Sequence, residues 1–261
     1  MDEHRPLRTF GRTKARALKP RQAALVETLL PHLAVAAGSA IDPEALFSGP
    51  QGGDAPALAP DAHADAATPD AATLDAPRWF AKPLVLEIGF GGGEHLVAQA
   101  SAQPRARFIG VEPFLNGVAS CLRHIEASGV TNVRVHQGDA RGVIVQLPDA
   151  SLDLCYILFP DPWPKLRHHK RRLIQPEFLS ALARVLKPGA ELRFATDWAD
   201  YGAWTLELFR RDRRFAWIAE SAGDWRHAWP GHVRTRYEQK RLGDCQPLWL
   251  RFVRQADAPK S

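Results

Sequence analysis

A glycine-rich turn with carboxylates on both sides is the first feature of the sequence that could carry chemistry. Residues 86–94 read Leu-Glu-Ile-Gly-Phe-Gly-Gly-Gly-Glu, and Gly89 and Gly91 allow a tight turn that a ligand can approach closely. Dinucleotide-binding turns carry a third glycine where this chain has Glu94, and Glu87 adds a second negative charge that a pyrophosphate would oppose. A cationic ligand is favoured instead. S-adenosyl-L-methionine, with its sulfonium and ammonium groups, suits that charge.

Two further carboxylates follow the next two predicted strands. Glu112 ends one of these strands and could accept both hydroxyl groups of a ribose, although a solvated glutamate at a strand end is the alternative. Asp139 could accept a hydrogen bond from an adenine amino group or cap the following helix, and the two roles are compatible. The glycine turn, the two acids and the strand that follows are the four parts expected of a site for S-adenosyl-L-methionine.

A stiff turn after the fourth predicted strand carries the most informative residues. Residues 158–165 read Leu-Phe-Pro-Asp-Pro-Trp-Pro-Lys, and three prolines in five residues can continue neither a helix nor a central strand. This turn holds Asp161, Trp163 and Lys165 at the ligand end of the sheet, unless it is only a rigid surface loop. A basic run follows at once and predicts phosphate contacts rather than a solvated face alone. Its members are Arg167, His168, His169, Lys170, Arg171 and Arg172.

A second strand-end acid and an arginine-rich segment complete the candidate substrate site. Asp197 follows the fifth predicted strand, so it is expected beside Asp161. The segment further along consists of Thr235, Arg236, Tyr237 and Glu238. Guanine offers N1–H and an exocyclic amino group as donors, so carboxylates suit its Watson–Crick edge. The side chains of Trp163, Trp198 or Tyr237 could stack on the base.

An alternating α/β frame must bring these residues together, and the pattern from about residue 79 predicts one. Short aliphatic or β-branched runs alternate with amphipathic segments, which implies a parallel sheet covered on both faces, with right-handed crossovers. The predicted strands are 84–88, 107–112, 132–136, 153–159, 190–195, 215–219 and 248–253. The predicted helices are 93–103, 115–128, 140–146, 175–186 and 200–211.

The N-terminal part of the chain differs in composition from this frame. Residues 1–22 are strongly basic, and they form either a solvated, flexible tail or an arm that contacts nucleic acid phosphates. Residues 21–36 predict a short helix interrupted near Pro31. Residues 49–77 are almost entirely Ala, Pro, Asp and Gly, which predicts a disordered linker. The expected units are an arm with a short helix at 1–48, a linker at 49–78 and a catalytic domain at 79–261.

Composition restricts the class of protein. The 261 residues suffice for one substantial domain with extensions, and the net charge of +5 is compatible with a polyanionic partner. Cys121, Cys155 and Cys245 lie far apart, which argues against disulfides and against a zinc site, so no metal is expected. The N-terminus lacks the apolar region of a signal peptide, and no apolar run approaches the ~20 residues that span a bilayer. We therefore expect no membrane contact and a cytoplasmic location.

With these motifs the chain resembles the bacterial tRNA (guanine-N7)-methyltransferases, which modify the guanine at position 46 in the variable loop. The motifs are LEIGFGGG (86–93), GVEP (110–113), GDA (138–140), FPDPWPKLRHHKRR (159–172), ATDW (195–198) and TRYEQK (235–240). The resemblance implies a Rossmann-like, doubly wound class I methyltransferase sheet of about seven strands, with a basic, partly disordered N-terminal extension. It also implies S-adenosyl-L-methionine as cofactor and tRNA as partner, and it leaves a monomer and a homodimer equally open.

The resemblance further implies roles for individual residues. The acids that match its cofactor-contacting positions, beside Gly89 and Gly91 of the turn, are Glu87, Glu112, Asp139 and Asp161. Asp161 also matches the position regarded as catalytic. The positions that match its substrate-binding residues are Lys165, Asp197, Thr235, Arg236, Tyr237 and Glu238, and the run from Arg167 to Arg172 matches an RNA-interaction segment. The chain departs from the family at Gly92, at Pro113-Phe114 and in the 49–77 insert, and the first two could slightly reshape the cofactor site.

The chemistry of guanine N7 predicts what Asp161 does. N7 already has an in-plane lone pair, so we expect Asp161 to position the base and support its developing positive charge rather than to act as a general base. Three alternatives remain: a methyltransferase acting on another RNA or a small molecule, an NAD(P)-dependent oxidoreductase, and a non-catalytic RNA-binding protein with a degenerate cofactor fold. The two basic segments count against a small-molecule substrate. The acids around the turn count against a dinucleotide, and the intact acidic set counts against loss of cofactor binding.

Overall fold

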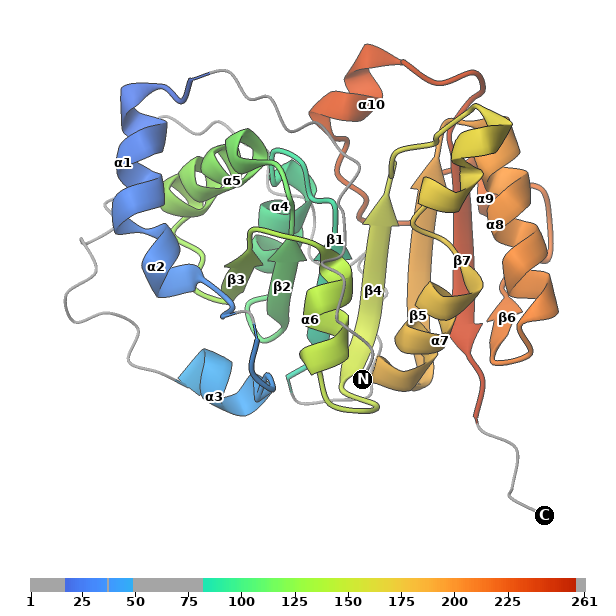
Figure 1. Cartoon of the computed structure of the whole chain (residues 1–261), viewed down its shortest axis with the longest axis horizontal. Helices are drawn as coiled ribbons and strands as arrows, with labels where there is room; N and C mark the ends of the chain where they lie inside the picture. The colour runs from blue at the N-terminus through green and yellow to red at the C-terminus, as the bar shows by residue number, and fades with distance from the viewer. Residues whose placement is uncertain (1–16, 37, 49–81, 257–261) are drawn as a thin grey trace.

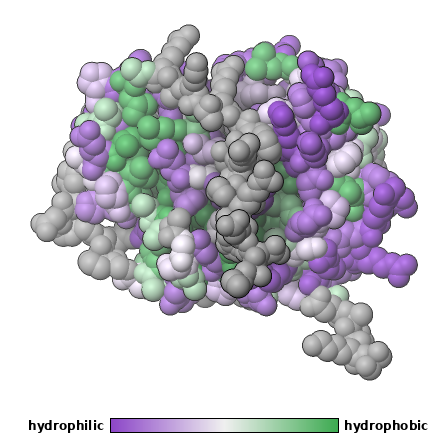
Figure 2. All heavy atoms as spheres, in the orientation of Figure 1, coloured by the Kyte–Doolittle hydropathy of each residue, from purple (hydrophilic) through white to green (hydrophobic). Residues whose placement is uncertain are grey.

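The computed structural model describes residues 17–36, 38–48 and 82–256. The predictions made for residues 1–16 and for the linker at 49–78 lie outside these ranges. In the described part, a central sheet is flanked by helices on both faces, and the N-terminal helices lie beyond one edge of the sheet (Figure 1). Hydrophilic residues gather over the opposite side, around α8 (Ala199–Arg211), where Arg210 and Arg211 are largely exposed (Figure 2).

Seven strands form the sheet of the described residues, in the order β3-β2-β1-β4-β5-β7-β6. They are β1 (Leu84–Ile88), β2 (Arg107–Val111), β3 (Val133–His136), β4 (Leu152–Leu158), β5 (Leu186–Thr196), β6 (Phe215–Trp217) and β7 (Leu248–Arg254). The neighbours from β3 to β5 are parallel, whereas β7 runs antiparallel to both β5 and β6. The expectation of a fully parallel sheet is therefore wrong at this edge.

The reversed strand β7 has a consequence for the site. Because β7 is antiparallel to β6, the two strands need no crossover helix, and residues 218–247 connect them at the edge where β4 and β5 also end. This connection contains only the short helices α9 (Gly223–Arg226) and α10 (Arg236–Lys240). The reversal therefore brings the predicted substrate segment to the carboxyl ends of the parallel strands.

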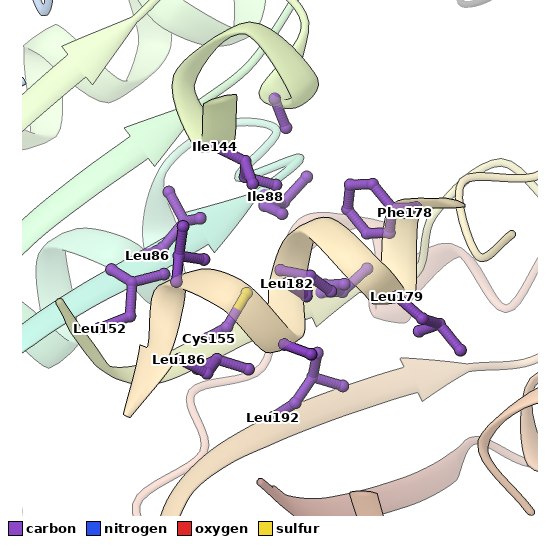
Figure 3. Close-up of a cluster of buried hydrophobic side chains, with 14 of the residues drawn as sticks. Leu86, Ile88, Ile144, Leu152, Cys155, Phe178, Leu179, Leu182, Leu186 and Leu192 are labelled. Atoms are coloured by element: carbon purple, nitrogen blue, oxygen red, sulfur yellow. The ribbon is translucent and has the colours of Figure 1, made fainter. Parts of the chain in front are cut away.

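Two apolar cores hold the layers together. One core contains Leu86 and Ile88 of β1 beneath α6 (Ala140–Gln146), α7 (Pro176–Val185) and α8 (Figure 3). The other contains Val85 beneath α4 (Glu94–Ala102) and α5 (Leu115–Ser128). Successive β1 side chains point to opposite faces, as strand geometry requires, so Glu87 shares the face of Val85 and lies toward α4.

The described N-terminal residues pack onto the sheet near β3. They form α1 (Pro20–Thr28), α2 (Leu30–Leu33) and α3 (Pro43–Ser48). Leu25 and Leu29 are buried in the core beneath α5, and Val35 and Ile41 are buried in the other core. The predicted interruption near Pro31 is confirmed, because this proline lies in the first turn of α2. No described helix has the length and apolar character to cross a membrane.

Candidate active site

The glycine turn after β1 has the backbone that its sequence predicts. Gly89, Gly91 and Gly93 have φ angles of 74°, 57° and 84°, values that residues with a side chain rarely adopt. Gly93 is also the N-cap residue that precedes α4. A methyl group added at Gly89 or Gly91 would meet no atom within 4 Å, so there is open space over the turn into which a ligand can fit.

Glu112 is tied to this turn by its own hydrogen bonds. Its Oε2 accepts the N–H of Gly91 at 2.9 Å, and its Oε1 accepts the N–H of Phe114 at 2.9 Å. Burial raises the pKa of Glu112 despite these two bonds, and the negative charge of Asp161 raises it further. A Cβ at Gly117 would lie 2.4 Å from the Gly91 carbonyl oxygen, so only glycine lets α5 approach this closely. The predicted ribose acid is thus held against the glycine turn.

Asp139 caps α6, which confirms the helix-cap alternative. Its Oδ1 accepts the backbone N–H and the Nε–H of Arg141, both at 2.9 Å, and its second oxygen pairs with the same guanidinium. Burial alone would raise the pKa of Asp139, but the hydrogen bonds and charge of Arg141 outweigh burial and lower it. Asp139 is therefore held ionised, and the contact with adenine stays a prediction.

Glu87 is enclosed behind the turn. Its side chain is 2% exposed, and its Oε2 is 2.7 Å from Nδ1 of His95, the second residue of α4. This carboxylate therefore already has a partner inside the protein. A direct contact between Glu87 and a cofactor stays a prediction, whereas its support of the first turn of α4 is a feature of the structure.

Asp161 lies in the turn after β4, whose backbone is constrained on both sides. Phe159 and Trp163 have φ angles of 51° and 44°, which are unusual for bulky residues, and a proline flanks Asp161 on each side. Asp161 is exposed. Its negative charge adds to the effect of burial in raising the pKa values of Glu112 and Tyr237. Asp161 therefore lies within electrostatic range of a predicted cofactor acid and a predicted substrate residue.

The basic run folds as a 3-10 helix, η1 (Leu166–Arg171), and its members differ in exposure. The exposed cations at and beside it are Lys165, Arg167 and Lys170. Two others contact the ring of Trp163: the His168 ring lies edge-on at 5.9 Å, and the Arg171 guanidinium lies 5.1 Å from the ring centre. The exposed members are accessible from solvent, and their contact with a phosphate backbone stays a prediction.

Arg172, unlike its exposed neighbours, has its partners inside the protein, and its contact with RNA stays a prediction. Its side chain is only 1% exposed, donates to the Pro162 carbonyl at 2.9 Å and pairs with Asp200. Its guanidinium also lies 5.3 Å from the ring centre of Trp204, which His169 contacts edge-on at 5.5 Å. Arg172 therefore fastens the rigid turn of Asp161 to α8, and His169, with a 13% exposed side chain, packs beside it.

The structure brings together two of the predicted substrate residues, Asp197 and Tyr237. The Tyr237 hydroxyl donates to Oδ1 of Asp197 at 3.2 Å, although Asp197 is only 5% exposed. Burial and the charge of Asp197 raise the pKa of Tyr237 to about 12, so its hydroxyl stays protonated. The Tyr237 ring lies 5.4 Å from that of Phe159, the first residue after β4. Tyr237 therefore connects the ends of β4 and β5 beside Asp161.

Thr235 and Glu238 form the N-terminal cap of α10. The Thr235 backbone N–H and hydroxyl both donate to Oε1 of Glu238, at 2.8 and 2.9 Å, and the hydroxyl accepts the Glu238 N–H. His232 Nε2 also binds the Glu238 carboxylate, at 3.0 and 3.1 Å. In the structure, these two predicted substrate residues cap the N-terminus of α10. The Arg236 side chain, by contrast, is 75% exposed and reaches to 4.0 Å from Glu94.

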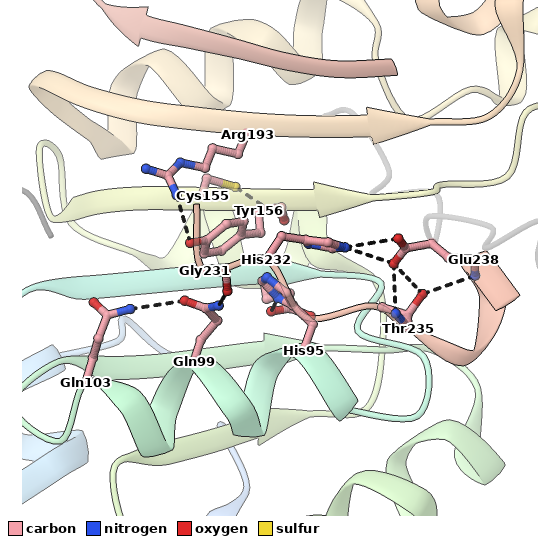
Figure 4. A network of polar contacts seen from close by, with 11 residues as sticks. His95, Gln99, Gln103, Cys155, Tyr156, Arg193, Gly231, His232, Thr235 and Glu238 are labelled. Atoms are coloured by element: carbon pink, nitrogen blue, oxygen red, sulfur yellow. Dashed lines mark hydrogen bonds and ion pairs between the residues drawn. The ribbon is translucent and has the colours of Figure 1, made fainter. Parts of the chain in front are cut away.

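Two buried histidines near the site were not predicted. His95 and His232 lie with ring centres 5.3 Å apart, and His232 faces the Glu238 carboxylate (Figure 4). His95 binds the carboxylate of Glu87 on its other side. Gln99, one turn beyond His95 on α4, donates to the Gly231 carbonyl at 2.6 Å. No sequence motif contains these histidines, so their pairing is visible only in the fold.

The residues present suit S-adenosyl-L-methionine. Open space lies over Gly89 and Gly91, and the acids of the turn offer carboxylates rather than a phosphate-binding glycine helix. Among the described residues, no group of three or more His, Cys, Asp or Glu side chains is placed to hold a metal ion.

The sheet order, the single reversed strand β7 and the acid-lined glycine turn define a class I S-adenosyl-L-methionine-dependent methyltransferase. A family model described as a putative methyltransferase matches residues 81–249. A tRNA (guanine-N(7)-)-methyltransferase of Caulobacter vibrioides strain NA1000 / CB15N is 51% identical over 252 residues, which cover 96% of each chain. That of Hyphomonas neptunium is 45% identical over 247 residues, covering 94% of this chain and 99% of its own. The chain therefore belongs to the tRNA (guanine-N7)-methyltransferase family.

Among solved structures, one of a 16S rRNA methyltransferase is similar with a TM-score of 0.46 at 15% identity, covering 67% of this chain and 88% of that chain.

Proposed function

We propose that this chain transfers the methyl group of S-adenosyl-L-methionine to N7 of a guanine in tRNA, at position 46 of the variable loop. The observation that carries the proposal is the placement of Asp161. This aspartate is exposed on a proline-fixed turn, in electrostatic range of Glu112 on the cofactor side and of Tyr237 on the substrate side. A tRNA substrate supports a cytoplasmic location for the enzyme.

On the cofactor side, the glycine turn and two acids provide the groups that bind the ligand. Gly89 and Gly91 leave space for the ligand, and Glu112, held by two backbone N–H groups, is placed to accept the ribose hydroxyls. Asp139 keeps its charge through Arg141, which supports its assignment as the acceptor for the adenine amino group. When bound, S-adenosyl-L-methionine supplies an electrophilic methyl group on a sulfonium.

On the substrate side, the task of the chain is alignment. Guanine N7 needs no deprotonation, because its lone pair already lies in the plane of the ring, so no general base is required. Asp161 orients the base toward the cofactor and stabilises the positive charge that the purine gains as N7 becomes alkylated. The Tyr237 hydroxyl donates to Asp197, so its oxygen and the Asp197 carboxylate both offer acceptors to the N1–H and amino groups of the guanine.

The exposed cations account for binding of the tRNA backbone. Lys165, Arg167 and Lys170 follow the turn of Asp161 and lie on its solvent side. Phosphate contacts of this kind position a nucleic acid without reading its bases. The identity of the methylated base therefore depends on Asp161, Asp197 and Tyr237, and the register of the tRNA depends on the cations.

The proposal is tested by mapping the transferred methyl group. The purified chain is incubated with methyl-labelled S-adenosyl-L-methionine and unmodified bulk tRNA, and the product is treated with borohydride and aniline, which cleave at 7-methylguanosine. Cleavage at one variable-loop guanine supports the proposal. Label in tRNA without that cleavage contradicts the choice of N7, and no label in tRNA contradicts the choice of substrate.

A further inference from the structure

The predicted substrate helix α10 is too short to be stable alone. It has five residues, whereas isolated helices need on the order of 12–15 residues to persist in water. Its cap depends on the buried carboxylate of Glu238, which is only 6% exposed and receives Nε2 of His232 in addition to Thr235. Burial alone would raise the pKa of Glu238, but the bonds from His232 and Thr235 lower it, so the carboxylate stays ionised. His232 is thus a principal anchor of α10.

His232 in turn rests on the helix that begins at the glycine turn. Its ring centre lies 5.3 Å from that of His95, with an angle of 33° between the ring planes, and 4.5 Å from that of Trp249. His95 is the second residue of α4 and follows Gly93 closely. The bond from Gln99 of α4 to the Gly231 carbonyl fixes the chain beside His232 (Figure 4). The loop before α10 is therefore held by the helix that starts beneath the cofactor.

The two histidines also have matching chemistry. His95 presents Nδ1 to the Glu87 carboxylate, and His232 presents Nε2 to the Glu238 carboxylate. Because a carboxylate accepts a hydrogen bond, each pairing places a proton on the named nitrogen and fixes the ring orientation. The side chains of His95 and His232 are 1% and 5% exposed. Rigid, buried groups of this kind transmit a shift of one element to the other rather than absorb it.

We propose that His95 and His232 are positioning residues that couple cofactor binding at the glycine turn to guanine recognition by α10. The chain of contacts runs from Glu87 of β1 through His95 and His232 to Glu238 of α10. A ligand that orders the turn and the start of α4 orders α10 as well, so each ligand binds more tightly when the other is present. This inference rests on the proposed function, because tRNA is the second ligand.

The experiment measures the coupling directly. The affinity of an unmodified tRNA transcript is determined with and without saturating S-adenosyl-L-homocysteine, which cannot donate a methyl group, at one salt concentration. We expect the wild type to bind tRNA at least ~5-fold more tightly with S-adenosyl-L-homocysteine present, at the lower end of ordinary coupling factors. In His95→Ala and in His232→Gln this factor falls below about 2. The double variant loses no more than either single one, because both remove the same contact.

The conservative variant separates coupling from general damage. His232→Gln keeps an N–H donor for Glu238 but loses the ring that faces His95, so its tRNA affinity without S-adenosyl-L-homocysteine stays close to that of the wild type. If His95→Ala fails to fold, His232→Gln still reports on the same contact from the other side. His227→Ala is the matched control, because His227 is exposed and its ring nitrogen hydrogen-bonds the Gly223 carbonyl one turn earlier, away from His95 and Glu238 in the sequence.

Two results overturn the inference while leaving the proposed function intact: a wild type without coupling, and variants that fold and keep the wild-type factor. A wild type that binds S-adenosyl-L-homocysteine but not tRNA contradicts the proposed function itself, and the inference fails with it.

Discussion

The cofactor side and the tRNA side of this site are built in different ways. On the cofactor side, Glu87, Glu112 and Asp139 are each held by hydrogen bonds from His95, from backbone N–H groups or from Arg141. On the tRNA side, Asp161 and the cations after it are exposed, and they lie on a turn and a 3-10 helix rather than on strands.

The difference teaches where the rigidity of the tRNA side comes from. A loop that binds a large partner must expose its charges, so it cannot be fixed by burying them. In this chain, neighbouring residues supply the fixed points: Arg172 anchors the turn of Asp161 at Pro162, and Glu238 anchors α10. Each exposed functional segment therefore has a buried charged residue within or beside it that fixes its position.

The largest expected effect is a loss of catalytic rate with little change in the binding of cofactor or tRNA. Asp161→Ala is expected to lower kcat at least about 100-fold, because the loss of one preorganised electrostatic group in an active site costs that much or more. The affinities for S-adenosyl-L-homocysteine and for tRNA should change no more than about 3-fold. Single-turnover kinetics measure the first quantity and equilibrium binding the second. Full activity of Asp161→Asn would show that the negative charge is not required.

The next effect is confined to the cofactor side. Glu112→Gln is expected to weaken binding of S-adenosyl-L-homocysteine by about 10-fold or more, the value of a hydrogen bond to a charged group, and to leave tRNA binding unchanged. Because the folded-state pKa of Glu112 is raised above 4.5, its carboxylate is neutralised at a higher pH than an ordinary glutamate. Wild-type affinity should therefore fall, as the pH is lowered, with a midpoint above 4.5, whereas the Gln variant lacks this step. Calorimetric titrations at several pH values test both expectations, and a midpoint at or below 4.5 would contradict the account.

A third change tests the buried anchors of the tRNA side. Arg172→Ala is expected to lower the free energy of unfolding by about 1–3 kcal/mol, since it leaves the Pro162 carbonyl without this donor and removes packing against α8. It should also lower kcat, because the turn of Asp161 loses its attachment. Thermal or urea unfolding, together with the salt dependence of tRNA binding, provides the measurement. A stable variant whose only defect is a weaker salt dependence would return Arg172 to the role of a phosphate contact.

The smallest effect concerns the exposed cations. Replacement of both Arg167 and Lys170 by Ala should weaken tRNA binding several-fold and reduce the slope of log K against log salt by about 2, one for each lost phosphate contact. The melting temperature and the affinity for S-adenosyl-L-homocysteine should not change. An equal loss of affinity for S-adenosyl-L-homocysteine would show that these residues support the fold instead.

The sequence predicts the regular part of this fold well, for a physical reason. The bounds of β1 and α5 match the predictions. A continuous apolar run indicates only a buried strand, and a clear helical period indicates only a helix, so each pattern specifies its element. The direction of β7 is not encoded in its own residues, since it follows from pairing with β5 and β6. The short helix α10 could not be found from periodicity, because five residues do not complete two turns.

In the site, residue types were predicted more reliably than residue environments. The basic run gave no means of separating Arg167, which is exposed, from Arg172, which is buried, because burial depends on Asp200 and Trp204 of a later helix. One further signal lies in the sequence: Thr-Arg-Tyr-Glu at 235–238 has the spacing of a capping box. This spacing predicts that Thr235 and Glu238 cap the N-terminus of a helix.

The most direct test of the central claim changes one atom of the substrate. A tRNA with 7-deazaguanosine at position 46 has a C–H in place of N7, while its Watson–Crick edge and its phosphates are unchanged. With methyl-labelled S-adenosyl-L-methionine, the account predicts no methyl transfer to this tRNA and an affinity within about 3-fold of the normal transcript, because phosphate contacts and edge contacts carry binding. Methyl transfer to the modified tRNA at the normal rate would contradict the claim that this chain aligns guanine N7 for methylation.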